Sequence, residues 1–89
     1  MRNHLPVAIL LMLLVAACNS WDTEDRERFQ RACLLKASLD GKSKKEAEKG
    51  CSCFQAELMT SFKNYDQYLR DNSEQGQALG AAAIIKCGL

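Results

Sequence analysis

The stretch SKKEAEKGCSCFQAELMTSFKNYDQYL, residues 43–69, decides the fold class. Its apolar side chains recur every three or four residues, which places them on one face of an α-helix. These side chains are Ala47, Cys51, Phe54, Leu58, Phe62, Tyr65 and Leu69. The opening Ser43-Lys44-Lys45-Glu46 matches a capping box, and Asp71-Asn72-Ser73 ends the segment. The pattern therefore predicts one long helix. Gly50 weakens it, so we expect the part before Phe54 to bend or to form a separate turn.

Two further helices flank this segment. The first is expected from about Asp22 to Leu39, with Asp22 or Thr23 as its cap and acidic residues near its positive end. Its apolar side chains are Phe29, Ala32, Cys33, Leu35 and Leu39. Asp40-Gly41-Lys42 then supplies a turn, in which Gly41 can adopt a positive φ.

The third helix is expected from Glu74 to about Lys86, after a Ser73 cap. Its apolar residues surround it almost completely, and a helix of that kind is usually buried or in contact with something. Central packing in a small bundle is favoured over an exposed docking surface. No strand pattern competes with the helices. The fold class is therefore predicted to be all-α, a domain of two or three helices.

The first eighteen residues carry a different pattern. Arg2 gives a basic start, an apolar run extends from Leu5 to Leu14, and Val15-Ala16-Ala17-Cys18 follows. A run of this length is too short for a comfortable transmembrane helix, which needs about 20 apolar residues. The arrangement resembles the signal of a small bacterial lipoprotein, in which the last four residues form the lipobox. An ordinary secretory signal, cut after Ala17 or Asn19, is the alternative.

The lipoprotein resemblance implies a division of the chain. Residues 1–17 would be the removed signal peptide, residues 18–21 the lipidated anchor and a short tether, and residues 22–89 a helical disulfide-bonded domain. Cys18 would carry a diacylglyceryl group on its sulfur and an acyl chain on its amine. Asn19 at the second mature position favours the outer membrane over the inner one, with the domain facing the periplasm. Trp21 would either sit at the membrane interface or belong to a loose linker.

Size and charge restrict the partners. Of the 89 residues, 72 follow residue 17, which is room for one small domain. The chain has 12 basic and 11 acidic residues, and losing Arg2 leaves 11 of each. A net charge of zero predicts no strong attraction to nucleic acid. The lipoprotein resemblance implies the bilayer as one partner, through the lipid on Cys18, and a protein of the cell envelope is the other expected partner.

Four cysteines remain beyond Cys18, at positions 33, 51, 53 and 87. An even number in a small exported domain predicts two disulfides, which a core of this size needs. The alternative is a soft-metal or thiol-redox carrier that uses Cys33, Cys51, Cys53 and Cys87. Zinc sites, however, usually use cysteine pairs separated by two to four residues, and only Ser52 separates the close pair here.

The spacing ranks the possible disulfide pairings. Cys33 and Cys51 each lie nine residues from Lys42, so they meet if the flanking helices form an antiparallel hairpin. Cys53 and Cys87 centre on Arg70, close to the second turn. This favours Cys33–Cys51 with Cys53–Cys87. Pairing Cys33 with Cys53 and Cys51 with Cys87 stays open as the alternative.

The sequence offers little catalytic chemistry. His4, the sole histidine, lies in the segment that would be removed, so no Ser-His or Cys-His pair is expected in the mature chain. Carboxylates such as Glu57 and Asp66 fit a solvated helix face. We therefore expect a non-enzymatic interaction protein that modulates an envelope complex, with no cofactor beyond the lipid on Cys18. Exclusion lipoproteins of conjugative plasmids, which keep related plasmids from entering, are similar in size, lipobox and lack of catalytic residues. Immunity and inhibitor lipoproteins are comparable.

Overall fold

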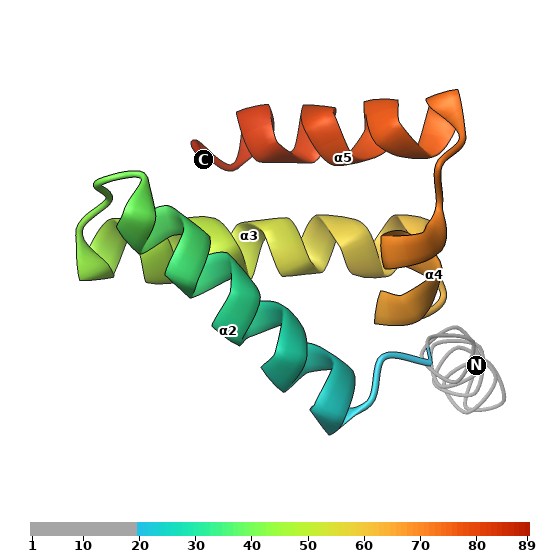
Figure 1. Cartoon of the computed structure of the whole chain (residues 1–89), viewed down its shortest axis with the longest axis horizontal. Helices are drawn as coiled ribbons and strands as arrows, with labels where there is room; N and C mark the ends of the chain where they lie inside the picture. Colours follow the sequence, from blue (N-terminus) through green and yellow to red (C-terminus); the bar gives the residue numbers. More distant parts are fainter. Residues whose placement is uncertain (1–19) are drawn as a thin grey trace, which may run out of the picture.

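The computed structural model describes residues 20–89, and the predictions for the signal peptide and for Cys18 lie outside the described residues. Four helices follow one another: α2 (Thr23–Leu39), α3 (Lys44–Ser61), α4 (Tyr65–Arg70) and α5 (Glu74–Lys86). The predicted all-α fold is confirmed. In Figure 1, α5 runs along one side of α3. α2 crosses α3 obliquely and is joined to it by the α2–α3 turn.

The helix starts follow the capping residues of the sequence. Asp22 caps α2 and Ser73 caps α5, each accepting a hydrogen bond from a backbone N–H of the first turn. Ser43 and Glu46 form the reciprocal bonds of a capping box at the start of α3, both at 3.2 Å. Gly41 has a φ of 87°, which lets the chain reverse between α2 and α3.

The long predicted helix differs from the structure in two places. The bend expected before Phe54 is wrong, because α3 continues through Gly50. Gly50 is buried, and a Cβ there would lie 2.6 Å from Cδ2 of Leu89. The missing side chain thus admits the C-terminal residue instead of bending the helix.

The second difference is a break between α3 and α4. Phe62 is extended, with φ −128° and ψ 141°, and Asn64 caps α4 by accepting from the Gln67 N–H at 2.7 Å. The break frees backbone carbonyls, and the segment ahead of α2 satisfies two of them. The Trp21 indole Nε1 donates to the Phe62 carbonyl at 2.9 Å, and the Ser20 N–H donates to the Lys63 carbonyl at 3.0 Å.

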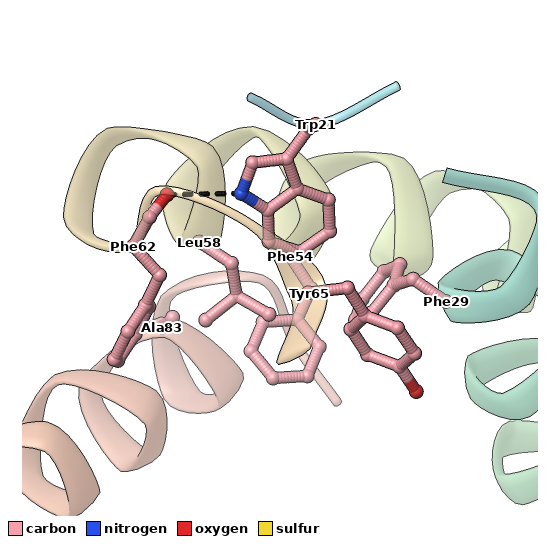
Figure 2. Packing of buried hydrophobic residues seen from close by; sticks show 7 residues of the cluster. All are labelled: Trp21, Phe29, Phe54, Leu58, Phe62, Tyr65 and Ala83. Atoms are coloured by element: carbon pink, nitrogen blue, oxygen red, sulfur yellow. Dashed lines mark hydrogen bonds between the residues drawn. The ribbon is translucent and has the colours of Figure 1, made fainter. Parts of the chain in front are cut away.

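The aromatic side chains gather where the N-terminal segment, α2, α3 and α4 meet (Figure 2). The buried cluster consists of Trp21, Phe29, Phe54, Leu58, Phe62, Tyr65 and Ala83. The interpretation of Trp21 as a loose or membrane-interface residue is therefore wrong, since only 3% of this residue is exposed. Tyr68, which the sequence pattern left outside the core, also packs against the cluster.

The outer helices bury less than their composition predicts. The central position expected for α5 is wrong, because it contributes Gly76, Gly80 and Ala83 to the interior and leaves Ile85 80% exposed. Gly80 faces Tyr68 of α4 and Gly76 faces Asp71, while the larger apolar side chains of α5 are partly or largely exposed. On α2, Leu39 is likewise exposed rather than buried.

Two disulfides fasten the outer helices to α3. Cys33–Cys51 joins α2 to α3, and Cys53–Cys87 joins the end of α5 to α3. Residues two apart on a helix point about 200° away from each other, so adjacent positions of α3 reach neighbours on different sides. Within residues 20–89, no helix is both long enough and apolar enough to span a membrane.

Candidate functional site

A groove of about 500 Å³ lies between α2 and the C-terminal part of α5. α2 forms one wall, Ile84 of α5 and Leu89 lie on the other side, and side chains of α3 and α4 form the floor. The residues that line it are Phe29, Ala32, Cys33, Lys36, Ala37, Asp40, Lys42, Phe54, Tyr65, Tyr68, Leu69, Ile84 and Leu89. The volume lies within the range of about 300–1,000 Å³ that is typical of small-ligand sites.

Aromatic rings make the floor of the groove rigid. Phe29 packs edge-on against Phe54, with ring centroids 5.3 Å apart, and against Tyr65 at 5.9 Å. Arg28 lies over the Tyr65 ring at 5.1 Å, which closes the outer side of this ring. Because these rings brace one another, the floor can present apolar surface without collapsing into it.

Charged groups gather at one end of the groove, beside the turn between α2 and α3. Lys36 forms an ion pair with Asp40, Nζ to Oδ1, at 2.9 Å. The Lys42 ammonium donates instead to the backbone carbonyl of Gly88 at 3.1 Å. This bond holds the C-terminal residues against the turn, so the end of α5 and the end of α2 frame the same opening.

The opposite end of the groove is aromatic and apolar. Tyr68 lies there against Phe62 and Phe54, at ring-centroid distances of 5.3 and 6.2 Å. Burial, and to a smaller extent the neighbouring Tyr65, raises the pKa of the Tyr68 hydroxyl above its usual 10.0. The phenol is therefore neutral at physiological pH. Leu69 next to it is 54% exposed, so apolar surface stays in contact with water.

The predicted site residues fall into two groups. Cys18, the predicted lipidation site, lies outside the described residues. The four other cysteines are joined in the pairing Cys33–Cys51 and Cys53–Cys87, at sulfur–sulfur distances of 2.11 and 2.04 Å. Each of the four sulfurs is thus bonded to one other sulfur, in two separate pairs. Over residues 20–89, no group of three or more histidine, cysteine or acidic side chains is placed to hold a metal ion.

The sequence pattern does not predict the groove, although two residues that line it, Lys36 and Leu69, are noticeable in that pattern. Lys36 interrupts the apolar pattern of the first helix, and this is the position at which α2 turns a charge toward the groove. Leu69 continues the apolar pattern of α3 but belongs to a separate helix after the break, which exposes it. The arrangement of α2 and α5 around the floor depends on long-range contacts, so no local pattern reports it.

Comparisons with models of protein families, with curated proteins and with solved structures find no match.

Proposed function

We propose that this protein is a lipid-anchored, non-enzymatic interaction protein of the bacterial cell envelope. It is held in the outer membrane by a lipid on Cys18, faces the periplasm and modulates a protein complex there, as exclusion, immunity or inhibitor factors do. The observation that carries the proposal is the exposed apolar side of α5 on a domain cross-linked by two disulfides.

The anchor rests on Val15-Ala16-Ala17-Cys18, and the fold adds a constraint on its reach. The Ser20 N–H bonds to the Lys63 carbonyl, so the folded part begins two residues after Cys18. Two residues span about 7 Å at most. A lipid on Cys18 would therefore hold the domain directly against the bilayer, and its partner would have to be reached there.

The two disulfides support an exported location. Disulfides persist in the periplasm and outside the cell and are rare in the reducing cytosol. Here they join both outer helices to α3, which restricts the movement of the helices that carry the outward side chains. A fixed surface loses little conformational entropy when a partner covers it.

α5 supplies the surface that we assign to the partner. Ile85 is 80% exposed and Leu79 is 42% exposed, although both belong to a helix whose composition is that of a buried element. Larger exposed apolar areas mark interaction sites, and burying an isoleucine or leucine side chain contributes about 1.5–3 kcal/mol. The proposed partner is therefore a protein with an apolar contact surface near the membrane.

The proposal is tested in two steps on the full chain expressed in a bacterial envelope. Mass spectrometry of the mature protein is expected to find an N-terminal Cys18 with three acyl chains, and Cys18→Ser is expected to release the domain from membranes. A photo-crosslinking amino acid at position 85 is then expected to give one discrete protein adduct of fixed stoichiometry.

Matched positions make the second step specific. The same crosslinker at position 52, on the exposed Ser52 of α3, serves as the control and is expected to give no such adduct. Ile85→Glu should abolish recovery of the complex without changing the disulfides. Unlipidated mature protein, or capture that is the same from positions 85 and 52, would contradict the proposal.

A further inference from the structure

The groove between α2 and α5 separates charge from apolar surface along its length. Its charged end, at the α2–α3 turn, contains Lys36, Asp40 and Lys42. From there α5 leads past Ile84 to Tyr68 and Leu69, where the side chains are aromatic or aliphatic. In Figure 1 the C-terminus lies beside the turn, whereas α4 lies at the other end of the domain. A ligand that fits this surface has one polar end and one apolar end.

The polar end of the groove offers a charged hydrogen-bond donor to an anion. Asp40 pairs with Lys36, whereas Lys42 bonds to the neutral Gly88 carbonyl and forms no ion pair within residues 20–89. Lys36 and Lys42 face the Asp40 carboxylate. Glu46 lies near enough to Lys42 for the lysine charge to lower the pKa of its carboxyl group. The Lys42 ammonium has three N–H donors, of which the Gly88 carbonyl uses one. A carboxylate placed there would gain a hydrogen bond to a charged donor.

The remaining length of the groove favours a hydrocarbon chain. Leu69 and Ile84 line it and are 54% and 38% exposed, so apolar side chains face water in the empty groove. A hydrocarbon chain has no hydrogen-bonding groups and can cover these side chains without leaving a polar group unsatisfied. The disulfides keep α2 and α5 attached to α3 on its two sides, so the groove stays open.

We propose that this groove binds one long-chain fatty acid, with the carboxylate at Lys42 and the chain along Ile84 toward Tyr68 and Leu69. This activity goes beyond the proposed interaction with an envelope protein. It also uses a different side chain of α5, because Ile84 lines the groove and Ile85 does not.

The test uses the lipidated, disulfide-bonded protein in phospholipid nanodiscs, which avoids competing detergent. A fatty acid with a diazirine near the end of its chain is added and photolysed, and the labelled residues are mapped by mass spectrometry. Labelling is expected on the peptides that contain Leu69 and Ile84. Palmitate should compete with the probe better than hexadecanol, which has the same chain length and no charge.

Neighbouring residues provide matched variants. Ile84→Glu is expected to reduce labelling at least about tenfold, while Ile85→Glu should leave it unchanged. Lys42→Gln should weaken competition by palmitate about tenfold, as expected for one hydrogen bond to a charged group, without affecting hexadecanol. Lys44→Gln, a lysine exposed outside the groove, should change neither. Circular dichroism and intact disulfides establish that each variant is folded.

Three outcomes would overturn the proposal. If labelling stayed intact in Ile84→Glu and in Lys42→Gln, the probe would be bound outside the groove, for example beside the lipid of the anchor. Equal competition by palmitate and hexadecanol would remove the role of the charged end. A photo-crosslinking amino acid at position 84 that gave protein–protein adducts, in place of probe labelling, would make a second copy or a partner helix the occupant. If Ile85→Glu lost partner capture but was still labelled normally, fatty-acid binding would be shown to be independent of the proposed interaction with an envelope protein.

Discussion

Trp21 joins the N-terminal segment to the break that follows α3. Its indole donates to the Phe62 carbonyl at 2.9 Å, and its ring lies 6.1 Å from Phe29 and 5.8 Å from Tyr65. Trp21→Ala is expected to lower the free energy of unfolding by about 3–5 kcal/mol, because the ring leaves a cavity. Trp21→Phe should cost less, about 1–3 kcal/mol, since it retains most of the ring and loses the hydrogen bond.

Urea unfolding followed by far-ultraviolet circular dichroism measures both changes without relying on tryptophan fluorescence. Leu35→Ala is the control, because this α2 side chain is 63% exposed and should change stability by no more than about 0.5 kcal/mol. If Trp21→Ala were as mild as Leu35→Ala, the residue would belong to a tether after all.

The capping box of α3 makes stability depend on pH. Hydrogen bonds from the side chain and the backbone N–H of Ser43 lower the pKa of Glu46 below its usual 4.5. A carboxyl group with a lowered pKa stabilises the folded state fully above pH 4.5, and this contribution disappears as the pH falls through the lowered value. Glu46→Gln should therefore have a lower melting temperature than the wild type at pH 7, and this difference should become small at pH 2.5.

Glu48→Gln, also on α3, is the matched control for this titration. Glu48 accepts no hydrogen bond from the cap, so its variant should follow the wild type at both pH values. A Glu46→Gln difference that persisted unchanged at pH 2.5 would show that charge on the cap plays no part.

At the scale of elements, two glycines of α5 have opposite roles. A Cβ at Gly80 would lie 3.7 Å from Cε1 of Tyr68, an ordinary contact, so Gly80→Ala should stabilise the protein by about 0.5–1 kcal/mol through helix propensity. A Cβ at Gly76 would overlap the Asp71 carboxyl group, which accepts two hydrogen bonds from Ser73. Gly76→Ala should therefore destabilise by about 1 kcal/mol. Thermal unfolding of the two variants measures the difference, and stabilisation by both would contradict this packing of α5.

The same elements show what the sequence could predict. Capping residues and the three-to-four-residue periodicity are local, so the starts of α2, α3 and α5 follow from the chain itself. Asn64 with Gln67 three residues later carried a capping signal as well, but the periodicity running on to Leu69 concealed it. Trp21 and Ser20, more than 40 residues away, also bond to the freed carbonyls of the break. The position of α5 and the groove beside it depend on contacts of the same long range.

At the scale of the whole molecule, α2 and α5 are held to α3 in different ways. α2 adds Phe29 to the aromatic cluster, whereas α5 buries only Gly76, Gly80 and Ala83. Apolar burial contributes about 25 cal/mol per Å², so these small residues provide little attachment. α5 therefore depends on Cys53–Cys87 more than α2 depends on Cys33–Cys51.

Paired alanine variants test this difference. The loops that the disulfides close span 34 and 18 residues, so removing Cys53–Cys87 should cost about 4 kcal/mol and removing Cys33–Cys51 about 3 kcal/mol. Hydrogen exchange should distinguish the two variants more sharply than stability does. In Cys53→Ala/Cys87→Ala, the amides of α5 are expected to exchange rapidly while those of α2 and α3 stay protected. In Cys33→Ala/Cys51→Ala, α2 should keep protection through Phe29. Protection of α5 that survived loss of its disulfide would mean that packing, and not the covalent link, maintains this wall of the groove.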